Sequence, residues 1–163
     1  MSNFNSLYDK IIKWEPSLQI PKDNLKLVNW KIFGYDGSDD SIDTSNLIFH
    51  NKSEFEQTFK TLYWDRWNAD YIKNQSIANI LVDWSYSSGA VPMVITKRIF
   101  GLNKKSTIES VVENINKTEQ SKFHKSISVF RYLYYKSLLK KDIKQVINFK
   151  EWILRLSDFR YEE

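Results

Sequence analysis

The chain has 163 residues, no cysteine, two histidines, four glycines and three prolines, and 15% of its residues are aromatic. This length is typical of one domain with a sizeable core, and an apolar content of 42% excludes a largely disordered protein. The absence of cysteine excludes disulfides, thiolate metal sites and cysteine nucleophiles. Because glycine is scarce, a sandwich or barrel with many turns is disfavoured and helices are expected.

The net charge of +4 is concentrated near the C-terminus. Residues 122–160 contain ten Lys and Arg against three acidic residues, whereas residues 1–121 are close to neutral. This pattern is typical of a solvated helix face, or of a surface for a polyanion such as an anionic membrane, a cell-wall polymer or nucleic acid. No recognition-helix motif is present, so no nucleic-acid partner is expected. The sequence shows neither a signal peptide nor a transmembrane segment, so synthesis in the cytoplasm is expected.

Apolar residues at helical spacing predict most of the secondary structure. The predicted helices lie near residues 2–15, 53–63, 76–88, 92–101, 106–115, 123–138 and 148–156. Ser53, Ser76 and Ser106 are expected to cap three of them. Trp84 and Trp152 lie on the apolar stripes and are expected in the core.

Residues 16–52 show a different pattern. Apolar residues alternate only in part, and residues 34–45 are polar and acidic, which predicts a small β-hairpin or an irregular lobe. The predicted fold class is therefore mainly α, with one domain over residues 1–163. Within it, residues 1–52 would form the first helix and the lobe, and residues 53–163 a helical lobe.

Glu15 is the carboxylate with the clearest chemical use. It is expected at the end of the first helix, because Pro16 disfavours helical geometry in the residue before it. The negative end of the helix dipole and the neighbouring Trp14 disfavour its charged form, so its pKa should be raised. A carboxyl group that stays protonated near neutral pH can serve as the general acid of a glycosidase. The alternative is a solvated residue at a helix end.

A second group of carboxylates lies in the expected lobe: Asp36, Asp39, Asp40 and Asp43. They could supply a second carboxylate for sugar chemistry, bind a hard cation, or form a polar surface turn. The calcium-loop pattern fails, because Ser41 stands where its turn glycine belongs and Leu47 where its last Glu belongs. Neither a metal nor a cofactor is expected.

Several segments, in the right order, carry a family resemblance. Residues 63–67 read YWDRW, residues 80–89 read ILVDWSYSSG, residues 99–102 read IFGL, and residues 149–155 read FKEWILR. Over about residues 54–102 and 123–157, the chain resembles the lysozyme-like glycoside hydrolase family 108, with its associated peptidoglycan-binding region. The resemblance implies a lysozyme-like helical domain and an N-acetylmuramidase of the phage or prophage endolysin type.

The resemblance also implies roles for particular residues. Glu15 stands where the family has its catalytic Glu, and Asp23 or Asp36 would be the second carboxylate. The substrate-binding candidates are Trp14, Trp64, Asp83 and Trp84, although each Trp is also explained by core packing. The implied substrate is the β-1,4 bond between N-acetylmuramic acid and N-acetylglucosamine in the glycan strands of peptidoglycan. The enzyme would act at the bacterial cell wall after release, with a separate membrane-hole-forming protein as a possible export partner.

The N-terminal part departs from the family pattern. Family members continue from the catalytic Glu as Glu-Gly-Gly-Tyr, whereas Pro16 and Ser17 follow Glu15 here. The Gly-Gly-x-Thr-Asn segment of the family is absent, and Ser87 replaces an Asn of the family. Because glycines beside a cleft let a sugar approach the backbone, a second hypothesis stays open. In it, the chain is a catalytically degenerate relative that binds the cell wall or a protein partner.

Overall fold

The computed structural model describes residues 1–15, 25–26, 32–33, 39–40, 48–49 and 51–163. The chain is mainly helical, as predicted. Its longer helices are α1 (Phe4–Trp14), α3 (Lys52–Phe59), α4 (Gln75–Ser88), α5 (Val91–Ile99), α6 (Ile108–Lys117), α7 (Gln120–Lys141) and α8 (Val146–Ser157). No helix in these described ranges is both long and apolar enough to cross a bilayer.

Shorter elements complete the described chain. They are the π-helix η2 (Lys60–Trp64) and the 3₁₀ helices η3 (Asp65–Trp67), η4 (Ala69–Tyr71) and η5 (Ile143–Gln145). Asn68 joins η3 to η4 with a positive φ of 46°, a conformation that Asn tolerates better than most residues. Two antiparallel pairs of two-residue strands join β1 (Leu25–Lys26) to β4 (Ile48–Phe49) and β2 (Ile32–Phe33) to β3 (Asp39–Asp40). Most of residues 16–52, for which a small β-hairpin or an irregular lobe is predicted, lies outside the described residues.

The helix N-termini differ from the predicted caps. Asn51, not Ser53, caps α3 and accepts a hydrogen bond from the backbone N–H of Glu54 at 2.9 Å. Asn74 replaces Ser76 as the cap of α4, and Thr107 replaces Ser106 as the cap of α6. In each case a neighbouring Asn or Thr has the same capping chemistry, so the helix was predicted correctly and its first residue was not.

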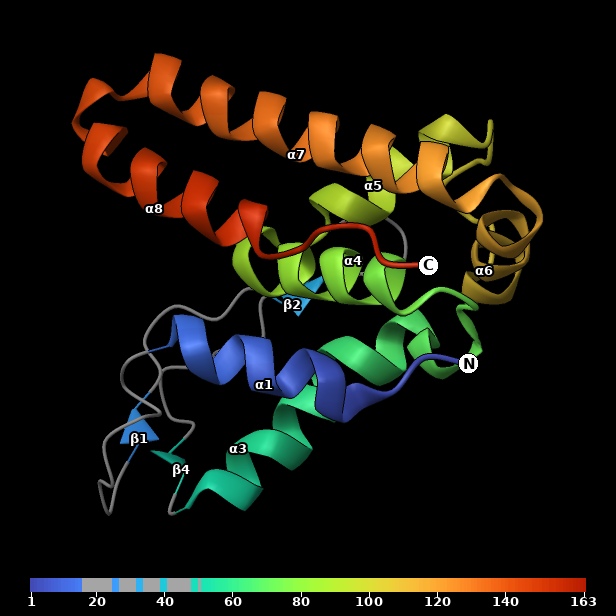
Figure 1. Ribbon diagram of the computed structural model, residues 1–163, viewed down its shortest axis with the longest axis horizontal. Helices are drawn as coiled ribbons and strands as arrows, with labels where there is room; N and C mark the ends of the chain where they lie inside the picture. Colours follow the sequence, from blue (N-terminus) through green and yellow to red (C-terminus); the bar gives the residue numbers. More distant parts are fainter. Residues whose placement is uncertain (16–24, 27–31, 34–38, 41–47, 50) are drawn as a thin grey trace.

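The core is built around α4. Figure 1 shows this helix in the middle of the molecule, with α1 and α3 on one side and α7 and α8 on the other. Contacts with α1, η2, α5 and α7 bury its apolar stripe from Ile77 to Trp84. Aromatic side chains of α1, α3 and η2 join the same core, and Phe4 of α1 lies 5.7 Å from Trp64 of η2 between ring centroids. Aromatic packing therefore holds the first helix against the centre of the fold.

Trp84 is fully buried, which confirms its predicted place in the core. Its indole N–H has no hydrogen-bond partner within the described part of the chain, so the side chain stabilises the fold through packing. Replacing Trp84 with Ala should lower the free energy of unfolding by about 3–5 kcal/mol, because the cavity cannot close completely. Urea unfolding followed by circular dichroism measures this loss. Trp84→Phe is the matched control and should cost clearly less.

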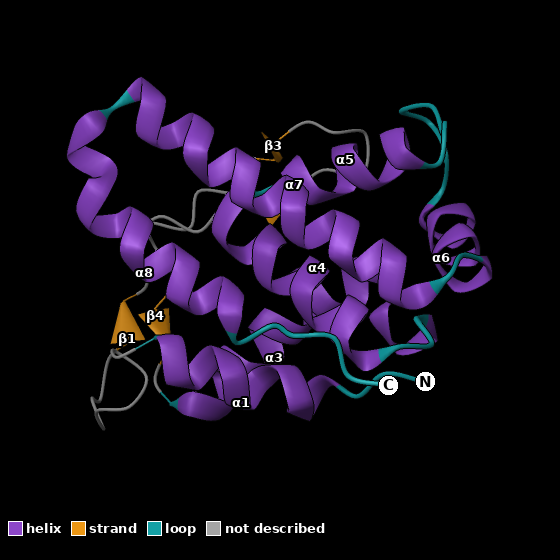
Figure 2. Cartoon of the chain, turned by 45° about the horizontal axis from the view of Figure 1, so that its top comes forward, coloured by secondary structure: helices purple, strands orange, loops and turns teal. Residues whose placement is uncertain are grey.

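The prediction for Trp152 is confirmed only in part. This side chain is half-buried and stacks on Tyr135 of α7, with ring centroids 5.3 Å apart. No residue of α8 is fully buried, because the helix packs mainly against α7. Figure 2 shows α7 and α8 as an antiparallel pair, with their linked ends far from α6. The last helix is thus an outer layer of the fold.

Candidate functional site

The candidate site centres on Asp83, a charged residue inside the buried stripe of α4. Its side chain is completely buried. Asp83 Oδ2 accepts a hydrogen bond from Arg131 Nη2 of α7 at 2.6 Å, and Oδ1 accepts one from Arg155 Nη2 of α8 at 2.6 Å. Two helices from the C-terminal part of the chain are therefore tied to the central helix by ion pairs. A buried carboxylate needs such partners, because an unpaired buried charge is strongly destabilising.

Arg131 is also completely buried. Its Nε donates a hydrogen bond to the hydroxyl of Tyr135 at 2.7 Å, and its guanidinium lies 5.5 Å from the ring centroid of Phe159. Its Nη1 has no hydrogen-bond partner among the described residues. Arg131 is thus held between aromatic rings and one carboxylate, which gives it a structural role.

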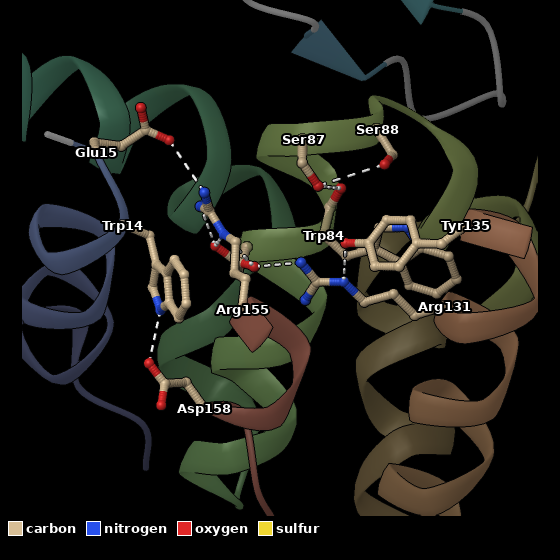
Figure 3. Close-up of polar contacts among 10 residues, drawn as sticks. Trp14, Glu15, Trp84, Ser87, Ser88, Arg131, Tyr135, Arg155 and Asp158 are labelled. Atoms are coloured by element: carbon tan, nitrogen blue, oxygen red, sulfur yellow. Dashed lines mark hydrogen bonds and ion pairs between the residues drawn. The ribbon is translucent and has the colours of Figure 1, made fainter. Parts of the chain in front are cut away.

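Arg155 connects this buried pair to Glu15. Its Nη1 donates a hydrogen bond to Glu15 Oε1 at 3.1 Å, while its other nitrogens bind Asp83. Figure 3 shows one oxygen of Glu15 facing this guanidinium and the other pointing away from it. The Glu15 side chain keeps 21% of its surface exposed, whereas Arg155 keeps 12% and Asp83 none. Glu15 is therefore the solvent-facing end of a mostly buried ionic network.

The end of α1 holds Glu15 in this position. The backbone N–H of Glu15 still donates to the carbonyl of Ile11 at 3.0 Å, so Glu15 is the C-cap of the helix, as predicted. The indole N–H of Trp14 donates to Asp158 Oδ2 at 2.7 Å, and Lys13 forms an ion pair with the same oxygen. Asp158 follows α8, so the last turn of α1 is fastened to the end of the helix that carries Arg155 (Figure 3).

The environment shifts the pKa values of the two carboxyl groups in opposite directions. Burial raises the pKa of Glu15, and the charge of Asp83 adds to the rise. The charge and hydrogen bond of Arg155, with a hydrogen bond from Tyr86, oppose the shift without cancelling it. Burial would also raise the pKa of Asp83, but Arg155 and Arg131 outweigh it and hold that pKa below its usual value. Glu15 is thus the group suited to carry a proton, and Asp83 stays charged.

Other carboxyl groups of the described chain are poorer proton donors. A groove between η4 and α6, with a volume of about 700 Å³, contains Glu109 and Glu113 beside the exposed ring of Tyr71. Hydrogen bonds with its own backbone N–H and with Thr107 lower the pKa of Glu109, and Lys117 lowers that of Glu113. Within the described ranges, Glu15 is the one carboxyl group with a clearly raised pKa.

The structure corrects the prediction of substrate binding for three residues. Trp64 and Trp84 are fully buried, so neither indole face is available to stack on a sugar. The indole N–H of Trp64 instead donates to Asp70 Oδ1 at 2.8 Å. Asp83 is also fully buried and bonded to two arginines, so it cannot contact a substrate directly.

Two further predictions have different outcomes. Trp14 is half-buried and lies next to Glu15, with the ammonium of Lys13 5.5 Å from its ring centroid. Its role in sugar binding therefore remains a prediction. Asp23 and Asp36, the candidates for the second carboxylate, lie outside the described residues.

Arg131, Arg155 and Tyr86 belong to the site but were not singled out in the sequence. One sequence signal could have indicated that arginines belong to the site. Asp83 interrupts an otherwise apolar run, and a buried carboxylate needs cationic partners. Tyr86 lies three positions after Asp83, so it shares the face of α4 that is directed at Glu15 and Arg155. In the described part of the chain, no group of three or more side chains could hold a metal ion.

No protein-family model matches the chain, and a search of curated proteins finds no match. Function is therefore inferred from the geometry around Glu15 and from the resemblance seen in the sequence.

Proposed function

We propose that the chain is a peptidoglycan hydrolase of the N-acetylmuramidase type, with Glu15 as its general acid. The observation that supports this most is the environment of Glu15. Its side chain is partly exposed and held at the end of α1, and burial raises the pKa of its carboxyl group. A glycosidase needs one carboxyl group that is protonated before the reaction. The sequence resemblance to family 108 supplies the substrate class.

In the proposed reaction, Glu15 protonates the oxygen of the β-1,4 bond between N-acetylmuramic acid and N-acetylglucosamine as that bond breaks. Arg155 acts as a positioning residue, because its hydrogen bond to Oε1 fixes the carboxyl group and favours the proton on the other oxygen. Asp23 or Asp36 would stabilise positive charge on the sugar or activate water. Their separation from Glu15 would decide between retention and inversion of configuration.

Product analysis tests this proposal directly. Purified peptidoglycan is incubated with the protein, and the fragments are reduced with borohydride and identified by mass spectrometry. A muramidase leaves N-acetylmuramic acid at the new reducing end, so muramitol is the expected reduced product. Glucosaminitol, or peptide fragments without new reducing ends, would contradict the assignment.

The proposal also places the protein at the bacterial cell wall, with a membrane-hole-forming protein as its export partner.

The second hypothesis, a catalytically degenerate relative that binds the cell wall or a protein partner, also has an observation in its favour. The Arg155 guanidinium stabilises the charged form of Glu15, which works against proton donation. In this case the protein would sediment with insoluble peptidoglycan or bind a protein partner, and it would release no reducing ends. Sedimentation and product analysis on the same samples distinguish the two hypotheses.

A further inference from the structure

The turn that joins α7 to α8 carries exposed apolar side chains. Ile143, Val146 and Ile147 are 74%, 54% and 75% exposed. Figures 1 and 2 both show that the linked ends of α7 and α8 extend beyond α4, at the left of each view. Single exposed apolar residues are ordinary on a protein surface, but three large aliphatic side chains within five positions of one protruding turn are not.

The same part of the chain is strongly basic. Residues 136–150, here called the hairpin tip, contain five lysines and one acidic residue, and all five lysines are exposed. They are Lys136, Lys140, Lys141, Lys144 and Lys150. Asp142, the acidic residue, caps η5 by accepting a hydrogen bond from the backbone N–H of Lys144 at 3.0 Å. No ion pair within the described ranges involves these lysines, so the tip keeps a net positive charge.

We propose that the hairpin tip docks on the surface of an anionic lipid bilayer. Ile143, Val146 and Ile147 enter the boundary between headgroups and acyl chains, and the surrounding lysines bind the anionic headgroups. Charge complementarity and exposed aliphatic side chains in one turn are the combination that an interfacial segment needs. This inference goes beyond the glycosidase proposal and does not depend on it.

Other occupants fit the tip less well. A second copy of the chain, docked through the same surface, would bring ten lysines together, and that repulsion disfavours a symmetric dimer. A hydrophilic polyanion would pair with the lysines but would leave Ile143 and Ile147 in water. The bilayer surface uses both the charge and the apolar side chains.

Vesicle sedimentation with the full chain tests the proposal. The protein is mixed at physiological salt with vesicles of phosphatidylcholine alone, or of equal parts phosphatidylcholine and phosphatidylglycerol. Binding is expected to the mixed vesicles and not to the neutral ones. K140Q/K144Q should lower the partition coefficient about 30-fold, since each lysine near an anionic surface contributes about fivefold. I143S/I147S should lower it roughly tenfold or more through lost apolar burial.

The matched control is K104Q/K105Q, which removes the same charge from another exposed part of the surface and should bind like the wild type. Circular dichroism checks that all variants are folded, and the replaced tip side chains are exposed. Equal binding to both vesicle types, or binding to neither, would overturn the proposal. Binding to anionic vesicles that the tip variants leave unchanged would also overturn it. A concentration-dependent dimer lost in I143S/I147S, without vesicle binding, would assign the tip to a second copy instead.

Discussion

Replacing Glu15 with Gln is expected to slow the release of reducing ends from peptidoglycan by about 10²–10⁴-fold, the usual contribution of general acid catalysis. Gln keeps the size of the side chain and its oxygen can still accept the hydrogen bond from Arg155, but it has no proton to donate. Thermal melting of both proteins checks that the fold is retained. The matched control is Glu113→Gln, which changes an exposed carboxyl group on α6 and should leave the rate unchanged.

The pH dependence provides an independent check on the same residue. The reaction needs protonated Glu15, so kcat/KM should fall as the pH rises through the pKa of this group. An ordinary Glu has a pKa of about 4.3. Because burial raises the pKa of Glu15, the fall in kcat/KM should occur at a higher pH than it would for an ordinary Glu. An active wild type with an equally active Glu15→Gln variant would remove Glu15 from the mechanism.

The helical part of this fold could be predicted from local patterns. The helix predicted for residues 76–88 is Gln75–Ser88 in the structure, and the helix predicted to begin near residue 92 begins at Val91. Apolar stripes fix such helices because each stripe must face the core. The π-helix Lys60–Trp64 was not predicted, since its i→i+5 hydrogen bonds depend on contacts with other elements and leave no periodic signal in the sequence.

The candidate site was less predictable because its contacts join distant parts of the chain. The position of Glu15 follows from one local fact, the proline that comes next in the sequence and disfavours helical geometry in Glu15. Its partner Arg155 lies 140 residues away, and Asp83 and Arg155 are 72 residues apart. No local pattern specifies which of the basic residues in the C-terminal part turns inward. Local patterns also do not show which side chains are buried, and for this reason the expectation that Trp64 and Asp83 contact a substrate was wrong.

Replacing Asp83 with Asn should destabilise the fold by about 3–5 kcal/mol. Asn is nearly the same size, but it leaves the fully buried Arg131 without a compensating charge and Arg155 with Glu15 alone. Urea unfolding followed by tryptophan fluorescence measures the change. Glu113→Gln removes a carboxylate from an exposed ion pair with Lys117 and should leave the midpoint nearly unchanged. A similarly small shift for Asp83→Asn would mean that the buried network does not stabilise the fold.

The pH dependence of this effect distinguishes lost charge from damaged packing. Arg155 and Arg131 overcome the cost of burial and hold the pKa of Asp83 below its value in the unfolded chain, about 3.9. The difference between the folded and unfolded pKa values of Asp83 contributes stability. This contribution is fully present at a pH above the unfolded pKa, and it is lost as the pH falls through the lower folded-state pKa. The gap between wild type and Asp83→Asn should therefore be widest near neutral pH and should narrow in acid. Damaged packing alone would instead give a gap that does not change with pH, because the cost of lost packing does not depend on the protonation of residue 83.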